Sequence, residues 1–340
     1  MRILVIRFSA MGDVALTVPV IAGMRRLYPD AEIVFLTRKV FHPFFSSIRG
    51  MPLFAPDLNY RHKGFGGIFR LFADIQQQYK PDIIVDLHDV IRSRILDLLF
   101  RINGAKVYVI NKGRSEKKAL VRGKKKIFLK HTVQRYADVF SKAGFQIVPE
   151  AESVFRPTVE SLNQTEPLML PGYLNIGVAP YTKHKLKMWP EEYMTKLLEL
   201  ISSGRKCRFF LFGGSEDMAK AEMLQSRFPG AINVIGKYSL DSELAIMSRL
   251  DLMIAMDSSN MHMAALAGIK VISIWGGTDP MAGFGPWMQP DSFSIRIPAE
   301  ELDCRPCTIY GKGETRRDFQ CMKKLTPEIV YKRMTTLKVI

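Results

Sequence analysis

The sequence repeats one pattern along most of its length: a short apolar run, a polar or glycine-containing turn, and a segment whose apolar residues have helical spacing. The first occurrence is Ile3 to Ile6, a turn over residues 8–13, and helical spacing from Val14 to Leu27. Apolar runs that alternate with helical segments predict parallel strands joined by crossover helices. We therefore expect an α/β protein built from doubly wound sheets.

The pattern occurs in two series. The first adds strands at 33–36, 83–87 and 106–110 and helices at 69–79, 92–100 and 132–143. The second has strands at 174–179, 208–212, 231–235, 252–256 and 270–275 and helices at 190–202, 216–227, 241–249 and 260–267. Residues 148–171 lack periodicity and contain four prolines, which indicates a linker.

This organisation predicts two Rossmann-like domains, and 340 residues suit two domains better than one. We expect an N-terminal domain over residues 1–155 and a C-terminal domain over residues 172–325. Residues 326–340 are expected to form a helix that packs back on the N-terminal domain. Two such sheets would place their strand-end loops around one central cleft.

The charge is strongly positive. The 49 Lys and Arg residues against 33 Asp and Glu give a net charge of +16, while 47% hydrophobic residues exclude a disordered chain. Nine basic residues and one acid, Glu116, lie between residues 112 and 130, so this segment alone carries half of the excess. An anionic partner is expected: nucleic acid, an acidic membrane surface or a phosphorylated substrate.

Nothing in the sequence indicates a membrane-spanning segment. No run approaches the roughly 18 to 20 apolar residues that cross a bilayer. The N-terminal apolar run is too short for a signal peptide, since the charged residues Arg7 and Asp13 come soon after it. Four cysteines do not make a disulfide framework and favour a reducing compartment. We expect a cytoplasmic protein.

The turn after the first predicted strand carries a carboxylate, Asp13, beside Gly12. Ligands of doubly wound sheets bind at the carboxyl ends of strands, so Asp13 is a candidate catalytic residue. The alternative interpretation is that Asp13 only complements a helix terminus. A single glycine does not make a dinucleotide-binding fingerprint.

Three loops of the second series could bind a phosphorylated ligand. Residues 179–190 contain Lys183, Lys185 and Lys187, which suit a diphosphate; the alternative is an ordinary solvated loop. Residues 257–262 precede a helix whose free N–H groups and dipole favour phosphate; the alternative is N-capping by Ser258 or Ser259 with His262 in the core. Residues 275–280 form a glycine-rich loop that allows close approach of a ligand, or a plain turn.

Cys304, Cys307 and Cys321 form the one cysteine cluster. A Cys-x-x-Cys pair can bind zinc, but structural zinc needs four ligands and this region offers three cysteines and no nearby histidine. We expect free thiols or a redox-labile pair and no metal site. The phosphate-binding P-loop, zinc-protease and Gly-x-Ser-x-Gly motifs are absent, as is an Asp-x-Asp pair.

Taken together, four motifs resemble glycosyltransferase family 9, which contains the ADP-heptose:lipopolysaccharide heptosyltransferases. They are Ser9 to Asp13, Lys187-Met-Trp-Pro190, Asp257 to His262 with the Ala264-Ala-Leu-Ala-Gly268 beyond it, and Trp275 to Pro280. The resemblance spans most of the chain, up to the cysteine region, and its specificity comes from the order and spacing of the motifs. The chain departs from the family at Ser259 and Gly276-Gly277, where the family often has Gly and Gly-Pro.

The resemblance implies a GT-B fold in which the N-terminal domain binds the acceptor and the C-terminal domain binds the nucleotide-sugar. It also implies an inverting, metal-independent glycosyltransferase that moves heptose from ADP-heptose to a lipopolysaccharide inner-core acceptor, with no cofactor. It implies that Asp13 is the general base, that Lys187 contacts the donor phosphates and that Asp257 holds hydroxyls of the donor sugar. The full set of expected donor-binding residues is Thr182, Lys187, Glu216, Tyr238, Asp257, Ser258, Ser259, His262, Gly276, Gly277 and Thr278.

The acceptor of this family is an anionic lipid-linked saccharide, and the basic residues assigned to the first domain suit it. We expect Arg61, Lys63, Lys124, Lys125 and Lys126 to bind the acceptor. The segment from 112 to 130 would also attract anionic lipids and hold a monomeric enzyme peripherally at the inner face of the inner membrane. The alternative is that this basic run is a solvated surface loop.

Two other functions compete with heptose transfer. Another nucleotide-sugar, carrying a hexose or an N-acetylhexosamine, could be the donor for surface polysaccharide synthesis. The basic excess also permits a non-enzymatic nucleic-acid-binding protein, but residues 112–130 contain only one aromatic residue, Phe128, which disfavours a base-stacking surface. We therefore expect no nucleic-acid partner.

Overall fold

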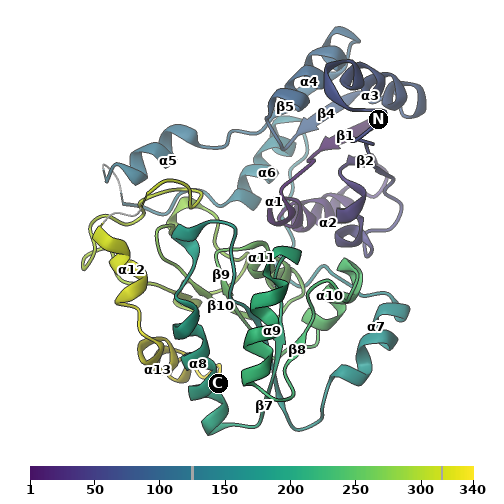
Figure 1. The fold of residues 1–340 in the computed structure, drawn as a ribbon. Coiled ribbons are helices and arrows are strands. Elements are labelled where there is room, and N and C mark those ends of the chain that lie inside the picture. The colour runs from purple at the N-terminus through teal and green to yellow at the C-terminus, as the bar shows by residue number, and fades with distance from the viewer. Residues whose placement is uncertain (124–125, 315–316) are drawn as a thin grey trace. The chain divides into compact units, whose positions relative to one another are not determined.

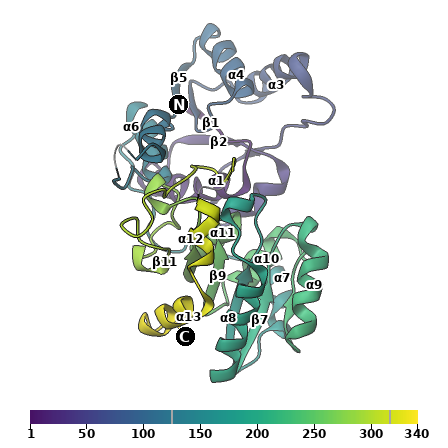
Figure 2. The same ribbon diagram turned by 60° about the vertical axis from the view of Figure 1, so that its left-hand side comes forward.

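The computed structural model describes residues 1–123, 126–314 and 317–340, and these divide into two compact units (Figures 1 and 2). Unit 1 comprises residues 1–112 and 132–155, and unit 2 comprises residues 113–131 and 156–340. Each unit contains one fully parallel sheet with helices on both faces. The prediction of an α/β fold with two Rossmann-like doubly wound units is confirmed.

Unit 1 contains a five-stranded sheet of order β3-β2-β1-β4-β5. Its elements are β1 (Arg2–Ile6), α1 (Met11–Ala15), α2 (Val18–Leu27), β2 (Glu32–Leu36), β3 (Leu53–Phe54), α3 (Gly64–Gln78), β4 (Ile83–Asp86), α4 (Ile91–Ile102), β5 (Lys106–Val109) and α6 (Thr132–Lys142). The central strand pairs in register with both neighbours, Ile3 opposite Ile33 and Ile83. Its apolar residues are fully buried, as expected of a strand covered on both faces.

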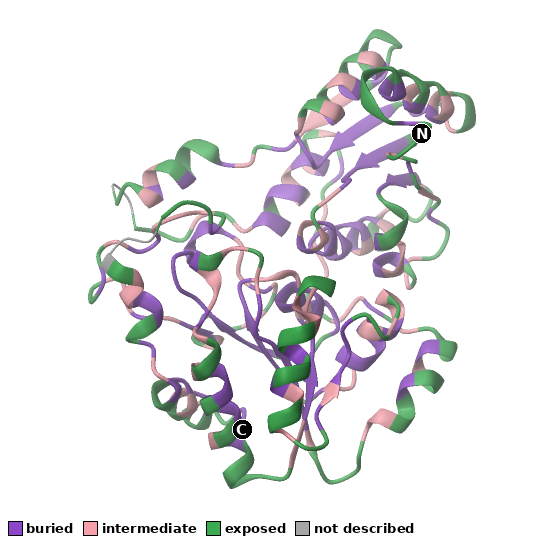
Figure 3. Ribbon diagram, viewed as in Figure 1, coloured by how far each residue is buried: buried purple, intermediate pink, exposed green. Residues whose placement is uncertain are grey.

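Unit 2 contains a six-stranded sheet of order β11-β10-β9-β6-β7-β8. Its strands are β6 (Leu174–Ala179), β7 (Cys207–Leu211), β8 (Ile232–Asn233), β9 (Leu252–Met256), β10 (Lys270–Ile274) and β11 (Ser294–Ile295). Its helices are α5 (Arg114–Val121), α7 (Val159–Thr165), α8 (Glu191–Gly204), α9 (Met218–Arg227), α10 (Leu240–Met247), α11 (Ser259–Leu266), α12 (Gln320–Lys323) and α13 (Pro327–Thr336). Figure 3 shows that burial concentrates in the strands, while helices such as α8 and α9 keep one exposed side.

Two local expectations were wrong. The first predicted helix is two helices, because Pro19 lacks an N–H and Thr17 Oγ1 bonds back to the carbonyl of Val14 at 2.6 Å. The predicted linker contains α7, whose N-cap Thr158 accepts a hydrogen bond from the N–H of Ser161. Periodicity could not reveal a helix of seven residues between prolines.

The C-terminal helix was predicted to pack back on the N-terminal domain, and this was wrong. Val330 and Met334 of α13, with Ile340 beyond it, are buried in the core of unit 2. The last helix therefore completes the unit from which it extends.

The basic segment also differs from the expectation, because its contacts group residues 113–131 with unit 2. Leu120 packs with Met281 and Ala282, and the ammonium of Lys117 lies 4.0 Å from the centre of the Phe284 ring. The N–H of Leu129 donates to the carbonyl of Met281 at 2.8 Å. Apolar contacts, which net charge does not reveal, decide where this segment lies.

Candidate active site

Each sheet reverses its strand order at one place, and the candidate residues gather there. The reversal lies between β1 and β4 in unit 1 and between β6 and β9 in unit 2. Ligands of doubly wound sheets bind at the carboxyl ends of the strands beside such a point. Asp13 and His88 follow β1 and β4, while Lys187 and Asp257 follow β6 and β9.

Asp13 lies in α1 and forms an ion pair with Arg7, which directly follows β1; Arg7 Nη2 and Asp13 Oδ2 are 2.5 Å apart. The Arg7 side chain is 6% exposed and the Asp13 side chain 33%. Burial by itself lowers the pKa of Arg7, but Tyr136 and Asp13 outweigh it and the pKa lies above its ordinary value. The guanidinium therefore stays charged beneath a carboxylate that reaches solvent.

The free oxygen of this carboxylate is its Oδ1. The Arg7 ion pair and the Ala10 N–H, at 3.4 Å, both use Oδ2. The main chain of Asp13 is also fixed, since the Tyr136 hydroxyl donates to its carbonyl oxygen at 3.3 Å. Oδ1 makes no hydrogen bond to any residue in the described part of the chain, so it is available as a proton acceptor.

His88 lies beside this pair. Burial and the nearby cations Arg7 and Lys112 lower the pKa of His88 to about 3, so its imidazole is neutral at physiological pH. The N–H of Phe8 donates to His88 Nδ1 at 3.4 Å, which leaves the ring hydrogen on Nε2. The carboxylate of Asp86, the last residue of β4, fixes the loop by accepting the N–H of His88 at 2.6 Å.

Unit 2 brings together three predicted donor-binding residues. Lys187 Nζ lies 2.9 Å from Asp257 Oδ2, and the same oxygen accepts a hydrogen bond from Thr278 Oγ1 at 2.8 Å. The Asp257 side chain is 8% exposed and the Lys187 side chain 17%. Lys183 and Lys185 of the same loop are exposed to solvent. Of the three loop lysines, Lys187 pairs with Asp257, and it is also the lysine that the family resemblance predicts for donor binding.

Backbone contacts tie together the loops that carry these side chains. The N–H of Gly277 donates to the carbonyl of Leu186 at 2.9 Å, and the N–H of Cys307 donates to the carbonyl of Gly277 at 2.8 Å. The fully buried Arg305 donates to the carbonyl of Thr278 at 3.2 Å. Thr182, also predicted in this loop, hydrogen-bonds the carbonyl of His184 at 2.8 Å and so shapes the loop locally.

The position of the Lys187 side chain also depends on a glycine, Gly311. A Cβ atom at Gly311 would lie 2.8 Å from Lys187 Cγ and 2.9 Å from its Cε, and the φ angle of Gly311 is +79°. Only a residue without a side chain leaves room for the lysine stem at this left-handed position. Gly276 is similarly crowded, by the side chain of Met322.

The start of α11 has the features of an anion site. Ser258 stands at the N-cap but its side chain accepts no capping hydrogen bond. Its Oγ is buried and has no hydrogen-bond partner among the described residues. His262 is buried one turn further on. An uncommitted hydroxyl at a helix N-terminus, beside Lys187 and Asp257, suits a phosphate group.

Two predicted donor residues do not join this cluster. Glu216 is exposed after β7, where its carboxylate folds over Gly214, and Tyr238 is half-buried after β8. Neither hydrogen-bonds to Lys187 or Asp257 within the described ranges. Both lie at the carboxyl edge of the same sheet, so their predicted contacts with ribose and adenine stay predictions.

The predicted acceptor residues do not form one group. Arg61 is held by Asp74, whose carboxylate oxygens lie 2.7 Å from its Nε and 2.5 Å from its Nη2, while Lys63 is exposed just before α3. Lys126 belongs to unit 2, where its ammonium donates to the carbonyl of Ala299 at 3.4 Å, so its assignment to the N-terminal domain was wrong. Lys124 and Lys125 lie outside the described residues.

Cys304 and Cys321 are free thiols, and burial raises the pKa of Cys321 to about 11. No group of three or more His, Cys, Asp or Glu side chains in the described ranges is arranged to hold a metal ion. Among those same residues, no helix combines the length and the apolar character that a bilayer crossing requires.

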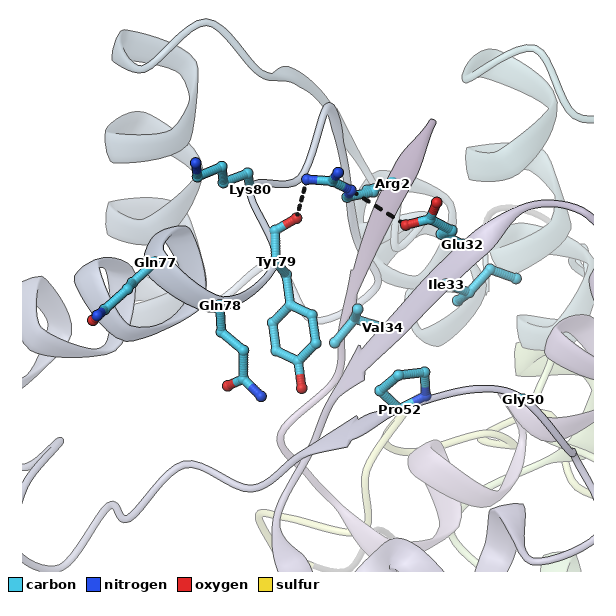
Figure 4. A pocket seen from close by; sticks show the side chains of 10 residues that line it. All are labelled: Arg2, Glu32, Ile33, Val34, Gly50, Pro52, Gln77, Gln78, Tyr79 and Lys80. Carbon is cyan, nitrogen blue, oxygen red and sulfur yellow. Dashed lines mark hydrogen bonds and ion pairs between the residues drawn. The ribbon is translucent and has the colours of Figure 1, made fainter.

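A separate hollow of about 610 Å³ lies at the other end of the first sheet. Arg2, at the start of β1, bonds there to Glu32 and to the carbonyl of Tyr79 (Figure 4). Asp13 and His88 follow the carboxyl ends of β1 and β4, at the edge of the sheet opposite to Arg2. This hollow is therefore distinct from the candidate site of unit 1.

Sequence reasoning missed Arg7, His88 and Arg305. A signal existed for Arg7, since a cation directly follows an apolar strand six residues before the candidate base. Asp86 ends β4 and His88 follows it, and β4 lies beside β1 in the sheet. The expected order of the strands could therefore have pointed to both residues. Nothing in the sequence distinguished Arg305 from other basic residues.

Known proteins resemble this chain over nearly its whole length. The sequence model described as glycosyltransferase family 9 (heptosyltransferase) matches residues 68–308. Lipooligosaccharide heptosyltransferase 2 of Haemophilus influenzae is 25% identical, covering 99% of both chains.

Two solved structures share the fold. A family 9 glycosyltransferase of Veillonella parvula has a TM-score of 0.77 at 20% identity and covers 99% of this chain and 96% of its own. Escherichia coli heptosyltransferase WaaC with ADP has a TM-score of 0.69 at 18% identity, covering all of both chains.

The fold and these relatives define an enzyme class, the glycosyltransferases of GT-B fold. Within that class the chain belongs to glycosyltransferase family 9, whose model matches well over half of its length.

Proposed function

We propose that this glycosyltransferase moves heptose from ADP-heptose to a lipopolysaccharide inner-core acceptor, with inversion and without a metal ion. The single observation that carries the proposal is the Lys187–Asp257–Thr278 cluster beside the uncommitted Ser258 hydroxyl. The names of the relatives support the choice of sugar, since they include a heptosyltransferase solved with ADP.

The leaving diphosphate needs positive charge. Lys187 supplies a cation, and the first N–H groups of α11 supply a partial positive charge of about half a unit. Preorganised donors of this kind contribute roughly 3 to 4 kcal/mol each to transition-state stabilisation. Asp257, held by Lys187 and Thr278, keeps its second oxygen for hydroxyls of the donor sugar.

The attacking hydroxyl must lose a proton as its oxygen bonds to the anomeric carbon. Asp13 is the proposed general base, and its Oδ1 would accept that proton. Arg7 holds the carboxylate in place through Oδ2. General bases contribute roughly 10²- to 10⁴-fold to rate. The neutral His88 beside the pair adds no competing positive charge.

We also propose contacts for the acceptor and the nucleoside, and a place in the cell. The acceptor is an anionic lipid-linked saccharide, for which the exposed Lys63 and Lys126 are candidate contacts. We propose a monomeric enzyme that works at the cytoplasmic face of the inner membrane. Residues after β7 and β8, Glu216 and Tyr238, would contact the nucleoside.

The test is direct transfer. Purified protein is incubated with ADP-heptose and heptose-deficient inner-core acceptor, with and without EDTA, and the product is read by mass spectrometry and its anomeric configuration by NMR. We expect one added heptose, an inverted anomeric centre and no loss with EDTA. Thermal shifts with ADP, UDP and GDP test the nucleotide, because a ligand at about 100 times its Kd stabilises by about 2.7 kcal/mol. Stabilisation by UDP or GDP alone would favour another sugar donor.

A further inference from the structure

The outer side of α4 exposes large apolar residues in a row. Ile91, Leu98 and Ile102 are 80%, 54% and 76% exposed, and Arg94 and Arg101 lie between them. Spacings of three and four residues place all five on one face of the helix. The inner face of α4 packs on the core of unit 1 through other residues, Leu96 and Phe100. We call this row the α4 stripe.

The neighbouring helix α3 adds exposed aromatic rings. Phe65 and Phe69 are 67% and 44% exposed, and their ring centres lie 5.3 Å apart in an edge-to-face arrangement. Phe72 of α3 packs against Phe100 of α4 at 4.8 Å, so the two helices lie side by side, as both views show (Figures 1 and 2). Both begin at the carboxyl edge of the sheet, the edge from which Asp13 follows.

The exposed charge on α4 has one sign. Arg92, Arg94 and Arg101 are its cations, and its single acid, Asp97, is 5% exposed. Arg94 pairs with Asp89 at 2.7 Å, while Arg92 and Arg101 form no ion pair with any residue of the described ranges. Lys63 and Arg70 flank the rings on α3. Apolar residues thus share a surface with uncompensated cations.

We propose that the α4 stripe, together with Phe65 and Phe69, docks on a bilayer surface that contains anionic lipid. Apolar side chains enter the interface between headgroups and acyl chains, while flanking arginines pair with lipid phosphates. A second copy of this chain fits less well, since a two-fold interface sets the same surface against itself and would oppose arginine to arginine. The surface serves the proposed function because a lipid-linked acceptor lies at a membrane.

This assigns membrane binding to a different surface from the basic segment expected from the sequence. That segment packs on unit 2, and its own exposed apolar residues are Ile127 and Phe128, at 45% and 58%. The two surfaces can be separated by substitution, since each is confined to one unit.

The experiment is sedimentation with vesicles of phosphatidylcholine alone or mixed with phosphatidylglycerol. The test variant is the triple substitution Ile91→Ser, Leu98→Ser and Ile102→Ser. The matched control is Met223→Ser, which removes a 73% exposed apolar side chain from α9. A second comparison carries Ile127→Ser with Phe128→Ser. Thermal unfolding checks that every variant folds.

We expect the wild type and the control to bind the mixed vesicles, less at high salt, and the triple variant to bind roughly tenfold more weakly or worse. Arg92→Gln with Arg101→Gln should weaken binding only to vesicles that contain phosphatidylglycerol. ADP affinity and transfer to a deacylated soluble acceptor should be unchanged in all of them.

Wild-type binding by the triple variant would overturn the proposal, as would loss of binding only in the variant at residues 127 and 128. A dimer in light scattering that the triple variant dissociates would assign the surface to a second copy instead. If heptose transfer fails while vesicle binding is intact, the proposed function is refuted and the docking surface is not.

Discussion

Each unit places a lysine or arginine against an aspartate at its switch point, but the two pairs present opposite charges to solvent. In unit 1 the cation is the buried partner: Arg7 is 6% exposed and Asp13 33%. In unit 2 the acid is the more buried partner: Asp257 is 8% exposed and Lys187 17%. The same pairing therefore offers a proton acceptor in one unit and a phosphate ligand in the other.

The difference comes from where each residue sits relative to its strand. Arg7 directly follows β1 and stays within the sheet's core, so Asp13, on the first turn of the next helix, is the outer member. Asp257 directly follows β9, and the outer member Lys187 arrives on a loop from the neighbouring strand. Position along the chain thus decides which charge a ligand meets. Substitutions at these positions test the difference between the two units.

The largest effect is expected from Asp13→Asn. The amide keeps the shape of the side chain but cannot accept the acceptor's proton, so kcat should fall roughly 10²- to 10⁴-fold. Initial rates at saturating ADP-heptose measure it. Thr17→Ser, a change in the same turn that keeps the hydroxyl, is the control and should stay within a few-fold of wild type. A wild-type kcat in Asp13→Asn would show that Asp13 is not the general base.

Lys187→Met should lower kcat/KM for the donor roughly 10²- to 10³-fold, because it removes a preorganised cation and leaves Asp257 buried without its ion pair. Lys183→Met is matched in chemistry and lies exposed in the same loop, and we expect it to change kcat/KM little. Equal losses in the two variants would show that general positive charge, rather than the ion pair, matters.

Gly311→Ala tests the positioning of Lys187 without touching its charge. The new Cβ would meet the lysine stem, and ADP affinity should fall about tenfold if Lys187 shifts by a few tenths of an ångström. Gly313→Ala is the matched control, because Gly313 also has a positive φ, +103°, but a Cβ there would meet no atom of the described residues within 4 Å. Both substitutions strain the backbone, so their losses of thermal stability should be similar. Only Gly311→Ala should weaken ADP binding in calorimetry.

The smallest effect concerns buried acids that belong to neither pair. Burial and the neighbouring Asp86 hold the pKa of Asp97 well above its usual range, and burial raises the pKa of Glu243 in unit 2 to about 7. Each folded-state carboxyl keeps its proton to higher pH than the unfolded chain, whose acids ionise near pH 4. The free energy of unfolding should therefore fall as pH rises from about 4, up to about 7 for Glu243 and up to about 8 for Asp97.

Asp97→Asn should flatten this pH dependence and stabilise the protein at pH 7.5, with Glu243→Gln doing so less. Urea unfolding at pH 5 and pH 7.5 measures both. Unchanged pH dependence in both variants would mean that these carboxyls ionise normally in the folded protein.

Most of the fold was predictable from the sequence, and the reason is periodicity. Strands such as β1 and β9 are short apolar runs with clear turns, and their strand ends located Asp13 and Asp257. Features that depend on contacts between distant residues were not predictable. The two short strands β3 and β11, of two residues each, carry no pattern of their own.

The candidate site was predictable in part for the same reason. The loop pattern by itself left three lysines open, and the family resemblance pointed to Lys187. In the structure, the contact with Asp257 distinguishes Lys187 from Lys183 and Lys185. Net charge indicated a basic segment at 112–130, yet its apolar contacts place it on unit 2. The contribution of Arg305 could not be predicted, because it hydrogen-bonds to Thr278, which lies 27 residues earlier in the chain.

The most direct test of the two opposite ion pairs is calorimetric titration of ADP into wild type, Asp13→Asn and Lys187→Met. We expect Asp13→Asn to bind ADP as tightly as wild type although it turns over slowly, and Lys187→Met to bind ADP much more weakly. Weakened ADP binding in Asp13→Asn together with full binding in Lys187→Met would contradict this expectation.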